Sequence, residues 1–153
     1  MAQTSDEAVR ILQKLIGICR DGENGYWEAA DHAKKPELKK FFQEKSLDRG
    51  QCAGELELEL RKIGVLDFKG SGSVAGALHR AWFELKDKLG AGDEGILTFV
   101  EQGENRAMKE FQEALQREEI PVDIRAAIHR VAARVESAYN AAGTLREREK
   151  ETT

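Results

Sequence analysis

The fold is decided by residues 8–30, which read AVRILQKLIGICRDGENGYWEAA. Apolar side chains recur there at steps of three and four residues, the spacing that places them on one face of an α-helix. They are Ala8, Leu12, Leu15, Ile16, Cys19, Tyr26 and Ala30. Because Thr4 or Ser5 can cap the free N–H groups of a first turn, the sequence predicts one amphipathic helix from there to about Ala33.

The same spacing predicts three more long helices in two hairpins. Pro36 begins the second helix, since a proline costs little in a first turn, and Gly64 ends it. The other pair is expected over residues 93–117 and 122–148, on either side of Pro121, with Glu147 to Thr153 frayed. The short link within each pair favours antiparallel packing.

The segment between the hairpins predicts how they are joined. Residues 68–73 (FKGSGS) mix glycines with hydroxyl side chains and favour a loop, and residues 74–89 are expected to form a helix. A phosphate-binding loop is not indicated, because neither a preceding strand nor a following Gly-Lys-Ser/Thr is present. We therefore predict an all-α fold and a single domain over residues 1–153: a four-helix bundle of two antiparallel hairpins joined by a crossover helix.

Composition narrows the classes of function. The 153 residues are 41% apolar and 34% charged with only two prolines, as is typical of long amphipathic helices. Acids outnumber bases 28 to 24, so the net charge of −4 lacks the basic excess of nucleic-acid binders. No apolar run approaches the roughly 20 residues that span a bilayer, and no signal core begins the chain. These features predict a cytoplasmic protein that binds neither nucleic acid nor membrane.

The sequence shows no motif for nucleophilic catalysis or for zinc binding. Cys19 and Cys52 form neither a disulfide framework nor a zinc motif, and we expect both to be small buried apolar side chains. No arrangement of serine, cysteine and histidine suggests a catalytic triad. The sequence therefore identifies no catalytic residue and does not favour an enzyme.

A short internal repeat points to the centre of the bundle. The motif DGEN at residues 21–24 recurs as QGEN at residues 102–105, each on the first helix of a hairpin. Glu23 and Glu104 therefore take equivalent positions within the apolar stripes. A carboxylate in the interior is costly unless a cation, a metal or water compensates it.

Two interpretations of these glutamates stay open. In the first, Arg49 lies on the inner face of the second helix and its guanidinium pairs with Glu23, Glu104 or both, a buried polar cluster. In the second, the glutamates bind iron or manganese, as in di-iron carboxylate bundles, although the Glu-x-x-His pairs of those proteins are missing. The metal donors would be Glu23, Asp48, Gln51, Glu101, Glu104, Glu136 and Tyr139.

His79 and Trp82 stand out on the expected crossover helix. The histidine could ligate or titrate, and the tryptophan could anchor a partner. The simpler interpretation is docking, with Trp82 covering the bundle and His79 making one hydrogen bond. Both residues are therefore predicted to form a docking surface, for the bundle itself or for a partner.

Three motifs carry a family resemblance over nearly the whole chain. They are RDGENGYWEAA at residues 20–30, GSVAGALHRAW at residues 72–82 and EQGE at residues 101–104. The chain resembles a bacterial family of ferritin-like four-helix-bundle proteins that is classed as a domain of unknown function. The resemblance implies a ferritin-like crossover and a bacterial cytosol, and it implies no established reaction, substrate or cofactor.

Two classes of function follow. The first is a non-catalytic bundle without a cofactor that associates with itself, as a homo-oligomer, or with another protein, in a stress response as the resemblance suggests. The alternative is a carboxylate-bridged di-metal protein or oxidase that uses iron or manganese.

Overall fold

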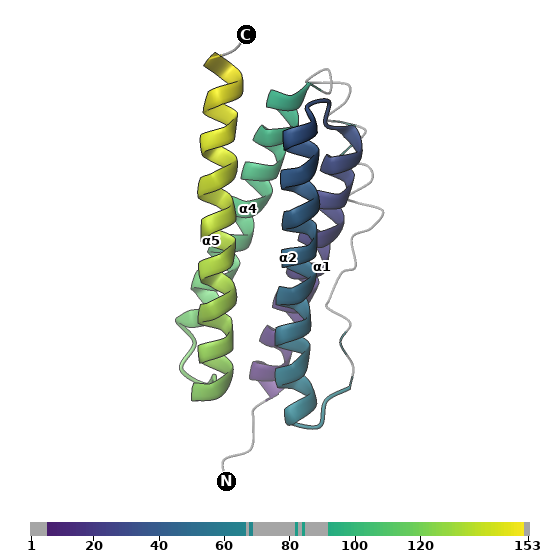
Figure 1. Cartoon of the computed structure of the whole chain (residues 1–153). Helices are drawn as coiled ribbons and strands as arrows, with labels where there is room; N and C mark the ends of the chain where they lie inside the picture. The colour runs from purple at the N-terminus through teal and green to yellow at the C-terminus, as the bar shows by residue number, and fades with distance from the viewer. Residues whose placement is uncertain (1–5, 67, 69–81, 83, 85–91, 152–153) are drawn as a thin grey trace.

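The structure, a computed structural model, describes residues 6–66, 68, 82, 84 and 92–151. Its helices are α1 (Asp6–His32), α2 (Pro36–Lys62), α4 (Asp93–Leu115) and α5 (Val122–Glu151) (Figure 1). No strand occurs within these described ranges. The prediction of an all-α fold with four long helices is confirmed.

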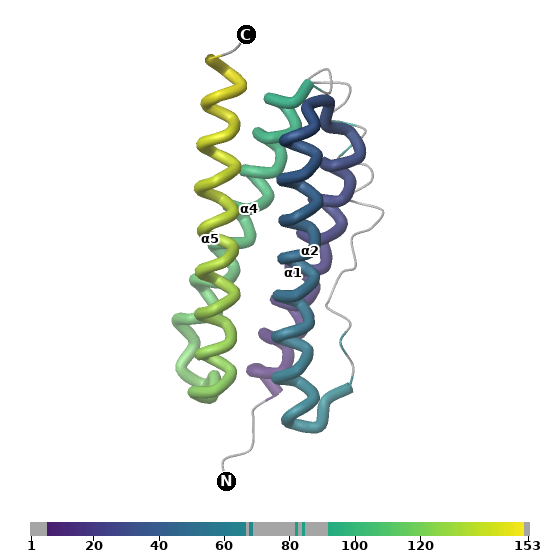
Figure 2. Tube along the Cα trace, viewed as in Figure 1, coloured from purple at the N-terminus to yellow at the C-terminus, as the bar shows by residue number. Residues whose placement is uncertain are grey.

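The four helices lie side by side as two hairpins. α1 packs along α2 and α4 along α5, while α1 also contacts α4 and α2 contacts α5 (Figures 1 and 2). The crossover helix predicted over residues 74–89 lies outside the described residues, apart from Trp82 and Glu84. No described helix is long and apolar enough to cross a membrane.

The predicted ends of α2 are confirmed by its backbone geometry. Pro36 occupies the first turn, where its missing N–H leaves no helical bond unmade. At the other end Gly64 has a φ of 82°, in the left-handed region that favours glycine. Its N–H donates to the carbonyl of Arg61 at 3.0 Å, and the N–H of Val65 donates to that of Leu60 at 2.9 Å. These two bonds close the helix as a Schellman motif.

The expectation that the chain is frayed from Glu147 is wrong as far as Glu151, because α5 continues to that residue, and Thr152 and Thr153 lie outside the described residues. Glu149 accepts a hydrogen bond from Nζ of Lys35 at 2.6 Å, which ties the last turns of α5 to the start of α2. Such a contact between distant segments is invisible to a local pattern of apolar residues.

Two apolar clusters make up the core, one above the other along the bundle. The first contains Leu15, Cys19, Leu56, Phe111 and Val131 among its members. The second includes Tyr26, Phe42, Ile96 and Ala142. On every helix the break between the clusters falls near the middle. A polar layer therefore divides the core at mid-height.

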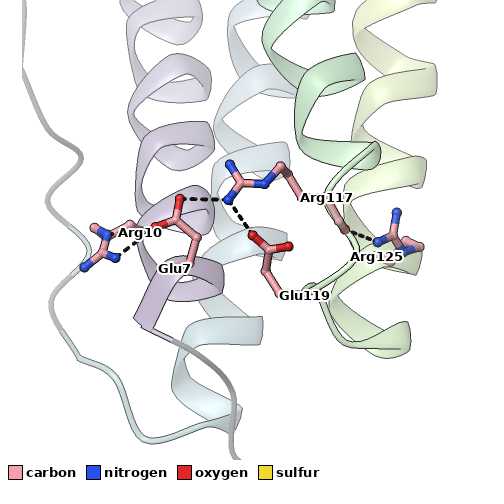
Figure 3. Close-up of polar contacts among 5 residues, drawn as sticks. All are labelled: Glu7, Arg10, Arg117, Glu119 and Arg125. Atoms are coloured by element: carbon pink, nitrogen blue, oxygen red, sulfur yellow. Dashed lines mark hydrogen bonds and ion pairs between the residues drawn. The ribbon is translucent and has the colours of Figure 1, made fainter.

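The lower end of the bundle is closed by a polar network (Figure 3). Glu7 near the start of α1 accepts hydrogen bonds from Arg10 at 2.8 Å and from Arg117 at 3.3 Å. Arg117 also pairs with Glu119, and Arg125 donates to the backbone carbonyl of Arg117. The link between α4 and α5 is thus bound to α1 through Glu7 and to α5 through Arg125.

Candidate functional site

The polar layer at mid-height is built on Arg49 and Glu104. Only 2% of the Arg49 side chain and 4% of the Glu104 side chain are exposed. Nη1 of Arg49 donates to Oε1 of Glu104 at 2.9 Å, and Nη2 donates to Oε2. The two planar groups therefore meet through paired hydrogen bonds, the strongest geometry for an arginine and a carboxylate. This pair joins α2 to α4, and so joins the two hairpins.

Tyr26 of α1 completes the layer. Its hydroxyl donates to Oε2 of Glu104 at 2.9 Å, and its ring lies 5.7 Å from the guanidinium carbon of Arg49. Burial, and then the neighbouring carboxylate of Glu104, raise the pKa of the Tyr26 hydroxyl well above its ordinary value. Tyr26 therefore stays protonated and acts as a hydrogen-bond donor.

The guanidinium of Arg49 stays positively charged because of the neighbouring Glu104 carboxylate. Burial opposes the charged form, but the carboxylate of Glu104 outweighs it and raises the pKa of the Arg49 guanidinium. Among the described side chains, Nε of Arg49 is nevertheless buried without a hydrogen-bond partner. The two charges of the layer are thus paired with each other, and one N–H donor, Nε of Arg49, makes no hydrogen bond to a described side chain.

Two glycines provide the space for the layer and its neighbour. A Cβ at Gly22 of α1 would lie 2.6 Å from Nη1 and 2.9 Å from Cγ of Arg49. A Cβ at Gly50 of α2 would lie 2.5 Å from Oε2 of Glu23. A real Cβ does not approach other atoms so closely. Gly22 is therefore part of the site, which analysis of the sequence missed although a glycine inside a helix is a signal of close approach.

Glu23 lies beside the layer and not in it. Its side chain is 34% exposed and accepts a hydrogen bond from Nη1 of Arg20 at 2.9 Å, while Arg20 also binds Glu57. The expected inward orientation of Glu23 is therefore replaced by a position against α2. On the inner face of this turn the guanidinium of Arg49 lies against Gly22, in the space that a side chain there would need.

The other predicted metal donors are dispersed, and most contact an arginine. Asp48 and Gln51 accept hydrogen bonds from Arg134 at 3.0 and 3.1 Å. Glu101 accepts a hydrogen bond from Arg146 at 3.1 Å. Glu136 is exposed on α5, and Tyr139 lines a shallow depression together with Glu101. The structure does not bring these donors to one point.

A different set of donors does converge within the described ranges. Single ligand atoms of Glu28, Asp31 and His32 lie within 4.8 Å of one another near the end of α1. Nδ1 of His32 lies 2.8 Å from the backbone carbonyl oxygen of Glu28, so this nitrogen donates to the helix. Asp31 and His32 are exposed and Glu28 is half-buried, so the group lies at the surface of α1.

Trp82 packs on the bundle. Its ring stacks on His32 with centroids 5.3 Å apart and contacts Phe99 at 4.8 Å, and only 6% of the residue is exposed. His79, predicted to share its docking surface, lies outside the described residues.

The two cysteines form no disulfide and lie in the first apolar cluster, the one that contains Leu15 and Phe111. Burial raises the pKa of the Cys19 thiol to about 12 and that of the Cys52 thiol to about 11. Both thiols are therefore protonated and weakly nucleophilic near neutral pH, as the sequence predicts for buried apolar cysteines.

The fold and the polar layer together define a class of protein: a four-helix protein whose hairpins are joined by a buried arginine–carboxylate pair. A family model described as Domain of unknown function (DUF2383) matches residues 7–117, and the chain belongs to that family. The match covers α1, α2 and α4, and α5 follows it. No curated protein matches the chain.

Proposed function

We propose that the protein is a non-catalytic, ferritin-like helical bundle of the bacterial cytosol that works by association, with an arginine in place of the metals. The observation that carries this proposal is the pairing of Arg49 with both oxygens of Glu104. A carboxylate whose two oxygens already accept hydrogen bonds from Arg49 and Tyr26 has little capacity left for a metal ion. Arg49 thus compensates the buried negative charge of Glu104, as a bound metal ion would.

The ferritin-like connection is supported by where the helices begin and end. Asp93 at the start of α4 accepts hydrogen bonds from the backbone N–H groups of Lys34 and Lys35, in the turn between α1 and α2. The end of α2 lies a whole helix away, about 40 Å at 1.5 Å per residue. The end of α2 and the start of α4, which the chain has to link, therefore lie at opposite ends of the bundle, as a ferritin-like connection requires. Trp82 against His32 and Phe99 supports docking of this connection.

Elemental analysis of protein purified without chelator tests the absence of a metal. We expect less than one iron or manganese ion per chain, and no rise in melting temperature when either ion is added. Glu104→Gln should lower the melting temperature equally with and without added metal. Two bound ions per chain, or a metal-induced rise that Glu104→Gln abolishes, would favour the di-metal oxidase instead.

Association is the second element of the proposal. Trp27 is 63% exposed on α1 and Leu47 is 70% exposed on α2, so each presents apolar surface to solvent. Sedimentation equilibrium should give a mass above that of one chain that falls on dilution, and Trp27→Ser should weaken the assembly. A constant single-chain mass in solution leaves association with another protein as the remaining form of the proposal.

A further inference from the structure

The outer face of α2 carries a stripe of residues that no other described helix covers. α2 packs against α1 and against α5, and it stands in front of α1 in Figure 1. Along its remaining face, exposed residues recur at steps that alternate between four and three, the spacing of the seam in a two-helix coiled coil. This outer stripe consists of Lys40, Glu44, Leu47, Gln51, Gly54, Leu58 and Arg61.

Two leucines give the outer stripe its apolar surface. Leu47 is 70% exposed and Leu58 is 49% exposed. Between them, a Cβ at Gly54 would meet no atom within 4 Å, so the stripe has an open position near its middle. A single exposed leucine is ordinary, but two on one seam with a gap between them suit the packing of another helix.

The order of residues along the outer stripe is self-complementary. If a second copy of α2 lies antiparallel across the first, centred midway between the two leucines, Leu47 of each chain lies beside Leu58 of the other. The same register sets Gln51 of each chain beside Gly54 of the other, where the missing side chain leaves room for it. A contact that is the same from both sides is what a twofold dimer requires.

The charges of the outer stripe fit this register too. It brings Glu44 of each chain beside Arg61 of the other, so a dimer gains two ion pairs. Within the described part of the chain, Glu44 makes no hydrogen bond or ion pair. The guanidinium of Arg61 lies 5.3 Å from the ring of Phe68 and pairs with no described carboxylate. Both charges are therefore available to a second copy.

We propose that the outer stripe of α2 is the interface of a twofold-symmetric, antiparallel dimer of this chain. The inference rests on the proposed association and deepens it, because it names the partner, the surface and the register. Two leucine layers and one pair of helices make a contact smaller than a standard interface. We therefore expect a dimer that dissociates at micromolar concentrations.

Charge reversal tests the pairing of the two chains. Sedimentation equilibrium of the full chain measures the dissociation constant, which Glu44→Arg or Arg61→Glu should each raise about tenfold, because two attractive pairs per dimer become repulsive. The double variant Glu44→Arg, Arg61→Glu should restore the wild-type constant. Arg106→Glu is the matched control and should leave it unchanged. Arg106 is likewise an exposed arginine without an ion pair in the described ranges, and it lies on α4, diagonally across the bundle from α2.

Cysteine variants test the register. Bismaleimidoethane, a short thiol cross-linker, should give covalent dimers in a mixture of Leu47→Cys and Leu58→Cys chains. Neither variant alone should cross-link, because in this register the two copies of residue 47 stand about 16 Å apart, and so do those of residue 58. The native thiols of Cys19 and Cys52 are buried and do not interfere.

Two kinds of result would overturn the inference, and they differ in what they leave of the proposed association. A dimer that Glu44→Arg does not weaken, or that cross-links through Leu47→Cys alone, would show that the chains associate by another surface or register. A constant single-chain mass at all concentrations would exclude both this interface and self-association.

Discussion

At the scale of single residues, the central feature is a charge pair that is almost completely buried. A buried arginine and a buried glutamate are each costly to remove from water, and their mutual hydrogen bonds offset much of that cost. The pair contributes geometry more than net stability, because paired hydrogen bonds between planar groups fix how α2 faces α4.

Removing one partner should therefore cost far more than removing both. Arg49→Leu leaves the Glu104 carboxylate buried with only Tyr26 as donor, and we expect a loss of about 3–5 kcal/mol in the free energy of unfolding. The double variant Arg49→Leu, Glu104→Leu should recover most of this loss. Urea denaturation of the single and double variants checks the prediction. Additive losses would show that the two side chains act independently.

Gly22 gives a second prediction with an internal control. Alanine is usually better than glycine inside a helix by about 0.5–1 kcal/mol, and Gly54→Ala, on open surface, should gain that amount. Gly22→Ala should instead destabilise by about 1–2 kcal/mol, because its Cβ displaces the guanidinium of Arg49. Equal thermal shifts in the two variants would mean that Arg49 moves away without cost.

The sequence predicts the composition of this site better than its geometry. The positions of Arg49 and Glu104 follow from the helical period, and the structure places both in the interior. The helical period places Glu23 within the apolar stripe, yet its side chain is 34% exposed and pairs with Arg20. The Arg49 side chain packs against Gly22 instead, and the helical period alone gives no weight to a missing side chain.

At the scale of helices and turns, Asp93 links the two hairpins at their upper end. Its carboxylate accepts hydrogen bonds from the N–H groups of Lys34 at 2.8 Å and Lys35 at 3.1 Å. The same residue lies in the first turn of α4, where a negative charge is favourable. One acid thus serves both the start of α4 and the turn between α1 and α2.

Asp93→Ala should destabilise the protein by about 1–3 kcal/mol, because two partly buried N–H groups lose their acceptor. Hydrogen exchange should accelerate most at the amides of Lys34 and Lys35. Glu94→Ala is the control, since its carboxylate also lies in the first turn of α4 but forms no hydrogen bond or ion pair with Lys34 or Lys35 within the described part of the chain. If both variants exchange alike, the contribution of Asp93 is confined to the helix terminus.

Helix boundaries show what local pattern can and cannot predict. Pro36 and Gly64 mark the ends of α2 because each restricts the backbone directly. The end of α5 is set by contacts with other helices, such as that between Glu149 and Lys35, so its charged last turns look frayed in the sequence. Local rules predict the first kind of boundary and miss the second.

At the scale of the whole molecule, stability should fall in alkali because of the buried thiols. The pKa of Cys19 rises from 9.0 to about 12 in the folded chain and that of Cys52 from 9.0 to about 11, so above pH 9.0 the unfolded chain releases protons that the folded chain keeps. The free energy of unfolding should therefore be undiminished by the thiols below pH 9.0 and decline through this window.

Chemical denaturation at several pH values measures that decline. The variant Cys19→Ala, Cys52→Ala should be less stable at neutral pH because of the cavities it creates, yet its alkaline slope should be shallower. An unchanged slope would assign the alkaline loss to Tyr26 and the surface charges.

The buried pair also has a consequence for the rate of folding. Arg49 belongs to one hairpin and Glu104 to the other, and each charge would be hydrated in a hairpin that stood alone. Water must leave both groups as the hairpins dock, before their hydrogen bonds are complete, so dehydration falls on the path to the native state. Stopped-flow refolding should accordingly be faster in the apolar double variant than in wild type, with the acceleration seen in the refolding arm of the chevron. The residue pair that fixes the native geometry would then be what makes the chain slow to reach it.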